Sequence, residues 1–161
     1  MVLEKEELAL ATKVKSAQYS AMDFAYFIVN YCTNNDIAIN ELKLQRVLYY
    51  VQLAFIYYLN KDAFYDDFVA SQYGPIVQEV ADEYSCYSST KICLCYEETE
   101  IFTKAEETII LAVLSNCLEK SGWELINLSK NSDGPWYKTY QNGLGYKKVI
   151  SKEMVREYAL K

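Results

Sequence analysis

Residues 40–59 read NELKLQRVLYYVQLAFIYYL, and this stretch decides the fold. Apolar side chains recur in it at steps of three and four residues, which places them along one face of an α-helix. Asn40 is suited to cap this helix, because its side-chain oxygen can accept a hydrogen bond from a free N–H of the first turn. We expect the helix to be central, with a long core stripe of Leu44, Val47, Leu48, Val51, Phe55, Tyr58 and Leu59, widened by Leu53 and Ile56.

Helical patterns also lie on both sides of this stretch. Gly74-Pro75 predicts the start of another helix, because proline is tolerated at a first helical position. Residues 91–102 alternate loosely, which fits a small β-hairpin or an extended loop with an acidic tip at Glu97-Glu98. Other helices are predicted over 21–32, after the Thr103/Glu106 capping box, near 123–129, after Pro135 and after Ser151.

The sum of these elements predicts a mainly α fold. We expect a single compact helical domain of about six to seven helices, with room for one small β-hairpin. The helical domain is assigned to residues 19–161, and residues 1–18 are expected to form an N-terminal arm or a short helix.

Composition narrows the classes of function. The chain has 161 residues, 16 of them tyrosine, and no histidine. Without histidine there is no Ser-His-Asp triad and no imidazole base, so the sequence favours a binding protein over an enzyme. Glycine-rich phosphate loops are also absent, and we expect no cofactor. Tyr49, Tyr50, Tyr57 and Tyr58 share one helix, which cannot bury all its sides, and exposed tyrosines suit protein interfaces.

Charge is unevenly distributed along the chain. The formal net charge is −6, yet residues 130–161 hold seven Lys or Arg against three Asp or Glu. The basic end is either a solvated surface or a docking patch for an acidic partner or a phosphate backbone. One alternative is therefore a nucleic-acid-binding regulator of a mobile element that uses Lys147, Lys148, Lys152 and Arg156.

The cysteines and the hydropathy of the chain indicate its cellular compartment and whether it holds a metal site. Five cysteines, an odd number, suggest reduced thiols in a cytosol, and we expect a cytoplasmic protein. Cys86, Cys93 and Cys95 fall within ten residues, but a zinc site needs a fourth ligand that is missing nearby, so no metal is expected. No run reaches the roughly 18 apolar residues that span a bilayer.

Carboxylates offer a second alternative, a carboxylate-dependent hydrolase. It would require several of Asp66, Asp67, Glu79 and Glu83 to converge in one cleft. Glu79 and Glu83 lie four residues apart on a predicted helix, where like charges repel. The pair marks either an acidic surface or a contact for a partner's Lys or Arg.

Three segments resemble the Panacea domain, the family of SocA-like antitoxins and phage-associated GepA-like proteins. Residues 42–50, LKLQRVLYY, resemble the family's LKLQKLLYY helix, and residues 68–77, FVASQYGPIV, are similar to its F-x-A-W-x-Y-G-P-V segment. Leu128-Ser129-Lys130, followed by Pro135-Trp136, looks like its L-S-H…P-W segment. The order and spacing make the resemblance specific over residues 20–160. Two positions differ from the family's motifs, since Ser71 replaces the family's tryptophan and Lys130 replaces its histidine.

The resemblance implies a non-enzymatic antitoxin that neutralises a cognate toxin by direct contact, and that can act as an adaptor to a cytosolic AAA+ protease. The expected partners are therefore proteins, with no membrane and no nucleic acid. Gln45 must find a hydrogen-bond partner if it is buried, and Trp136 is expected to plug the core beside Tyr49 or Tyr73. The expected motif and contact residues are Leu44, Gln45, Tyr49, Tyr73, Gly74, Pro75, Glu79, Glu83, Pro135 and Trp136, none of them catalytic.

Overall fold

The structure, a computed structural model, describes residues 14–97 and 100–161. Within these ranges the fold is mainly α, as predicted, with seven α-helices and one small antiparallel sheet. The predicted arm, residues 1–18, lies mostly outside the described part. The helices are α2 (Ala21–Asn34), α3 (Glu41–Leu59), α4 (Gln78–Glu83), α5 (Lys104–Leu118), α6 (Gly122–Ser129), α7 (Pro135–Tyr140) and α8 (Lys152–Ala159).

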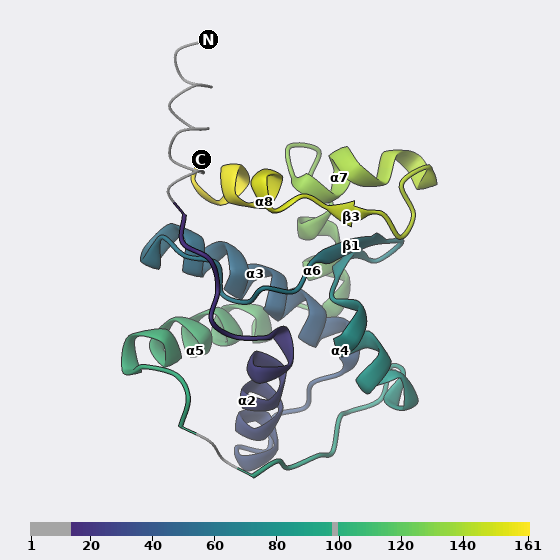
Figure 1. Ribbon diagram of the computed structural model, residues 1–161. Helices are drawn as coiled ribbons and strands as arrows, with labels where there is room; N and C mark the ends of the chain where they lie inside the picture. Colours follow the sequence, from purple (N-terminus) through teal and green to yellow (C-terminus); the bar gives the residue numbers. More distant parts are fainter. Residues whose placement is uncertain (1–13, 98–99) are drawn as a thin grey trace.

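Helix α3 lies at the centre, which confirms the expectation from its long apolar stripe. It contacts α2, α5, α6 and α8, and Figure 1 shows it crossing the middle of the molecule between α5 and α8. Asn40 caps it by accepting a hydrogen bond of 2.9 Å from the N–H of Lys43. The stripe holds from Leu44 to Ile56, but Tyr58 is 70% exposed, so the prediction that it is buried was wrong.

The sheet joins distant parts of the chain in the order β2-β1-β3. It consists of β1 (Phe68–Ser71), β2 (Gly74–Ile76) and β3 (Val149–Ile150). Strand β1 pairs antiparallel with both neighbours. Figure 1 shows the sheet beside α7 and α8, at the opposite end of the molecule from α2.

One prediction at the local level was wrong. Gly74-Pro75 begins a strand, and the helix starts later, at Gln78. A side-chain turn explains this, because the Ser71 hydroxyl donates to the carbonyl of Gly74 and accepts from the N–H of Tyr73.

The small hairpin of the structure lies at residues 68–76. Residues 91–97 form a loop, one of the two possibilities predicted for this stretch, and do not pair with a strand. They are attached instead to α2 and the loop that follows it. The N–H of Ile92 donates to Ile39, and the Thr33 hydroxyl donates to the carbonyl of Leu94. Of the predicted acidic tip, Glu97 is exposed and Glu98 lies outside the described residues.

Side-chain caps begin the predicted helices where the sequence places them. The Thr103/Glu106 capping box is present at α5, and Ser151 caps α8 by accepting from the N–H of Met154. A further capping box, Ser20 with Asp23, starts α2. Among the described helices, none is both long and apolar enough to cross a membrane.

Candidate functional site

A fully buried arginine on α3 organises the region where the sequence motifs meet. Arg46 Nη2 donates to the carbonyl of Pro75 at 2.7 Å, while Nη1 donates to the carbonyl of Tyr73 and to Ser129 Oγ at 3.3 Å. Burial lowers the pKa of the guanidinium to about 10, against the opposing effect of Glu41. The group therefore stays charged at neutral pH, and backbone carbonyls solvate it in place of water.

Gly74 is the residue that lets the hairpin approach this arginine. Its φ is +104°, a backbone conformation that side-chain-bearing residues rarely adopt. A Cβ at this position would lie 2.0 Å from Arg46 Nη1 and 2.5 Å from Ser129 Oγ. Glycine is thus required both for the turn and for the close approach to Arg46.

Gln45 makes the neighbouring connection between α3 and the hairpin. Its side chain is buried, accepts from the N–H of Val77 at 2.9 Å and donates to the carbonyl of Val77 at 3.1 Å. Its amide also donates to Glu41 at 2.9 Å. The expectation that a buried Gln45 finds a partner is confirmed. Together Gln45 and Arg46 fix residues 73–77 against α3.

Trp136 closes the cluster from α7. Its indole N–H donates to the carbonyl of Ser71 at 2.7 Å, and its ring stacks on Tyr140 with centroids 4.6 Å apart. Only 6% of the residue is exposed. Lys130, at the position where the resemblance expects histidine, places its Nζ 5.1 Å from the Trp136 ring centroid. Burial and the charge of Arg46 lower the pKa of Lys130. Its side chain lies over the face of the indole, in the geometry of a cation–π contact.

The outer face of the cluster exposes aromatic side chains. Tyr73 is 37% exposed and Trp123, on α6, is 67% exposed. Their rings meet edge to face with centroids 6.5 Å apart. We call Tyr73 and Trp123 the aromatic face.

The structure brings some predicted residues together and separates others. Gln45, Tyr73, Gly74, Pro75 and Trp136 meet around Arg46. Leu44 and Tyr49 are buried in the core, where the Tyr49 ring packs edge to face on Phe68 at 5.6 Å, and Pro135 is the buried first residue of α7. Glu79 and Glu83 are exposed on α4 and do not join the cluster.

Sequence reasoning missed the central residues of this arrangement, namely Arg46, Ser129 and Trp123. One signal was available for Arg46, because a charged residue between Gln45 and Val47 interrupts an apolar stripe. Ser129 gave no such signal. Its hydroxyl meets the guanidinium only because α6 packs against α3.

Four residues of the two alternatives, Asp66, Asp67, Lys152 and Arg156, are engaged in contacts within the fold. Asp66 accepts from the N–H of Ala21 at 2.7 Å, and Asp67 pairs with Lys152 at 2.6 Å. Arg156 donates through Nε and Nη2 to the buried carboxylate of Asp62. These contacts hold the loop before β1 against α2 and α8, which accounts for both acids and for two of the basic C-terminal charges.

The three cysteines that fall within ten residues of one another are exposed. Cys86, Cys93 and Cys95 lie on the surface, whereas Cys32 and Cys117 are buried. Burial raises the pKa of Cys32 and of Cys117 to about 11, so both remain thiols. Across residues 14–97 and 100–161, no three Cys, Asp or Glu side chains gather in a way that could hold a metal ion.

The motif segments that meet at Arg46 lie within one family match. Residues 44–137 match the family described as Antitoxin SocA-like, Panacea domain. The chain belongs to this family. Comparison with curated proteins and with solved structures gives no match. The match covers α3, the hairpin, α6 and the start of α7, so the Arg46 cluster is the part of this Panacea domain where its motifs converge. Membership in an antitoxin family indicates a toxin as the general kind of partner.

Proposed function

We propose that this protein is an antitoxin that neutralises a cognate toxin by binding it directly in the cytoplasm, through the aromatic face. One observation carries the proposal. The family segments converge on Arg46 with their polar groups turned inward, and leave Tyr73 and Trp123 partly exposed beside one another. Nothing in this arrangement is poised for bond breaking, so we propose a binding protein and not an enzyme.

The aromatic face has the properties of an interface centre. Tyrosine and tryptophan are enriched among the residues that contribute most binding energy at interfaces, because they bury a large area with little loss of side-chain entropy. Tyr73 is held on a hairpin whose backbone carbonyls bind Arg46. A partner that binds here would therefore meet a surface ordered before contact, which limits the entropy cost of association.

The charge distribution favours a protein partner over nucleic acid. The net charge is −6, and Lys152 and Arg156 of the basic end are already paired with Asp67 and Asp62. Lys147 lies 5.5 Å from the ring centroid of Tyr146. A gel shift with the promoter of its own gene at moderate salt tests the regulator alternative, and we expect no shifted band.

The experiment pairs this protein with the product of the neighbouring open reading frame. We expect that product to arrest growth alone, and co-expression of this protein to restore growth and to yield a complex that co-purifies. Trp123→Ala and Tyr73→Ala should each weaken the complex about tenfold or more, as truncation of an aromatic hot spot does. Failure of rescue together with absence of a complex would overturn the proposal.

Tyr57→Ala is the matched control. Tyr57 is 60% exposed and lies near the C-terminal end of α3, away from the hairpin. This variant should rescue growth like the natural sequence. An adaptor role is proposed as a second step, in which toxin levels fall only when this protein and a AAA+ protease are both present. A toxin that persists at unchanged levels while growth is rescued would leave direct neutralisation as the mechanism.

A further inference from the structure

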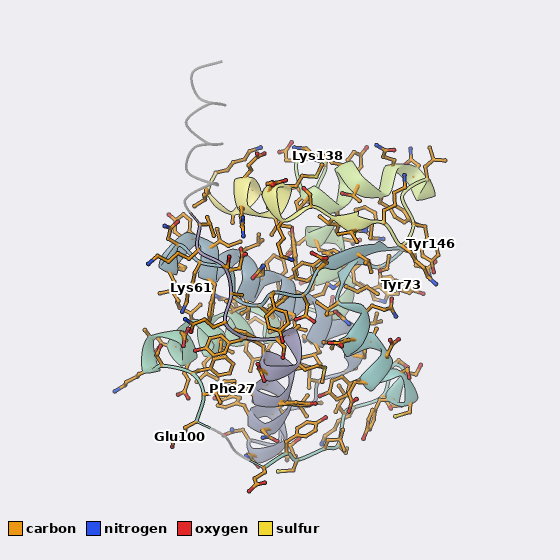
Figure 2. The ribbon with its side chains drawn as sticks, in the orientation of Figure 1. Phe27, Lys61, Tyr73, Glu100, Lys138 and Tyr146 are labelled. Carbon is orange, nitrogen blue, oxygen red and sulfur yellow. The ribbon has the colours of Figure 1, made fainter. Side chains whose placement is uncertain are left out.

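A large hollow lies on a different part of the molecule, between α2 and residues 96–97 and 100–107. Its volume is about 820 Å³. Figure 2 shows Phe27 and Glu100, two of its lining residues, in the lower part of the view, and Tyr73 on the opposite side. The hollow therefore uses elements that the aromatic face does not use.

The charge of the hollow has a single sign. Among the residues that the structure describes, four carboxylates line it, from Asp23, Glu97, Glu100 and Glu107, and none of the lining side chains is Lys or Arg. The nearby lysines either form salt bridges with other carboxylates or lie outside the hollow. Lys61 pairs with Glu106, Lys91 pairs with Asp36, and Lys104 is exposed at the start of α5 without lining the hollow.

Aromatic rings form the walls between these charges. Tyr26 and Tyr96 face one another with ring centroids 4.3 Å apart, and Phe27 meets Phe102 edge to face at 5.5 Å. The negative face of an aromatic ring attracts an ammonium or a guanidinium. Carboxylates and aromatic faces in one hollow thus favour the same kind of ligand.

Tyr96 is fixed in place before any ligand arrives. Its N–H donates to Asn30 Oδ1 at 2.5 Å, and its carbonyl accepts from Asn30 Nδ2 at 3.0 Å. Its hydroxyl forms a hydrogen bond of 2.8 Å with the hydroxyl of the buried Tyr84. A wall fixed by three hydrogen bonds loses little freedom when a ligand binds.

We propose that this hollow binds a segment of a partner protein that carries arginine or lysine side chains. The cationic heads lie among the carboxylates of Asp23, Glu97, Glu100 and Glu107, and their apolar stems lie against Tyr26 and Tyr96. Charge complementarity selects the occupant, because an acidic or neutral segment would leave these carboxylates without counter-charges in a partly desolvated space. This inference does not depend on where a toxin binds.

The test measures binding of a short fluorescein-labelled peptide of alternating arginine and serine to the full chain by fluorescence anisotropy. We expect binding at low salt that weakens as the ionic strength passes about 0.1 M, where charges beyond about 10 Å are screened. The double variant Glu97→Gln/Glu100→Gln should raise the Kd about fivefold. A peptide of alternating glutamate and serine should not bind.

The matched control separates a local site from a general acidic charge. Glu119→Gln/Glu124→Gln removes the same number of charges at two exposed positions, one directly after α5 and one on α6, and should leave the Kd within about twofold of the natural protein. If this control weakens binding as much as the hollow variant does, the peptide is attracted by net charge alone and the proposal is wrong. The same conclusion follows if the peptide does not bind the natural protein.

A second comparison tests the aromatic wall. Tyr26→Leu removes one ring from the hollow, whereas Tyr57→Leu removes an exposed ring elsewhere. We expect Tyr26→Leu to raise the Kd about two- to fivefold and Tyr57→Leu to leave it unchanged. Equal effects would overturn the aromatic part of the proposal. Because no toxin is used, failure here leaves the antitoxin proposal standing, and failure of the toxin experiment leaves this one standing.

Discussion

The Arg46 cluster and the acidic hollow use charge in opposite ways. In the cluster a single cation is fully buried and donates to two backbone carbonyls and a serine hydroxyl. In the hollow, four carboxylates from the described residues line an open space, and none of the described lining side chains is Lys or Arg. The first region directs its polar groups to its own chain, and the second leaves carboxylates such as those of Glu97 and Glu100 exposed to solvent.

This difference shows which region maintains the fold and which is suited to binding. A buried charge is costly unless hydrogen bonds replace its water, and both Nη atoms of Arg46 make such bonds. Two of these bonds go to the carbonyls of Tyr73 and Pro75, so the Arg46 cluster adds to the ordering of residues 73–77. Like charges around a hollow repel one another, and a ligand of opposite sign relieves this repulsion. Stability should therefore depend on the cluster, and binding of cations on the hollow.

The largest expected effect is the loss of stability in Arg46→Ala. The substitution leaves a cavity on α3 and removes the donors to the carbonyls of Tyr73 and Pro75. We expect a loss of about 4 kcal/mol in the free energy of unfolding, measured by urea titration. Arg46→Met keeps most of the volume without the donors and should lose about half as much. If Arg46→Met were as stable as the natural protein, the hydrogen bonds to the hairpin would not matter.

The next largest effect is expected for Gly74→Ala, which tests the close approach of the hairpin to Arg46. A Cβ would meet Arg46 Nη1 at 2.0 Å in a backbone of φ +104°. We expect a loss of about 3 kcal/mol, from backbone strain and displacement of the guanidinium together. The control Gly143→Ala has a similar φ of +101° but no atom within 4 Å of the added Cβ, so it isolates the strain. It should lose about 1 kcal/mol, and equal losses would show that the approach to Arg46 is not tight.

Glu106, which is next in sequence to a residue that lines the hollow, provides the third test. Glu106 is buried and accepts from Lys61 Nζ at 2.5 Å, from the Tyr19 hydroxyl at 2.8 Å and from the N–H of Thr103. Its neighbour Glu107 lines the hollow. Burial alone would raise the pKa of Glu106, but these hydrogen bonds outweigh it and hold the pKa below its ordinary value of 4.5.

A pKa lowered in the folded state means that ionised Glu106 stabilises the protein above pH 4.5, and that this contribution is lost as the pH falls through the folded pKa. Glu106→Gln should therefore lose about 2 kcal/mol at pH 7. The difference from the natural protein should shrink when urea titrations are repeated at pH 4 and below. A difference that stayed constant down to pH 3 would mean that the charge of Glu106 plays no part.

The elements of this fold could be predicted where the signal is local. The apolar period of residues 44–56, the capping box at Thr103 and the cap at Ser151 depend on neighbours within a few residues, and all three are confirmed. The prediction of a helix start at Gly74-Pro75 was wrong because it also used only local sequence. A positive φ followed by proline suits the end of a turn before either a strand or a helix, and only the pairing with β1 decides between them.

The clusters themselves depend on contacts between distant residues. Arg46 and Ser129 are 83 positions apart, and Asn30 and Tyr96 are 66 positions apart. A residue pattern predicts which face of a helix is buried, but not which carbonyl or amide will lie against it. The motif resemblance identified the segments that meet at Arg46, but gave no signal for Trp123 on the aromatic face or for the hollow beside α2.

The smallest expected effect has the opposite sign to the others. Glu97→Gln/Glu100→Gln removes two exposed carboxylates that lie beside Asp23 and Glu107 in the hollow. Relief of repulsion should raise the melting temperature of the free protein by about 1 °C at low salt, and the gain should disappear at high salt. Differential scanning calorimetry at two ionic strengths measures it, with Glu119→Gln/Glu124→Gln as the control. A gain in stability joined to a loss of peptide affinity is the behaviour of residues kept for binding at some cost to the fold. A loss of stability in this variant would instead place Glu97 and Glu100 with Arg46, among the residues that hold the structure together.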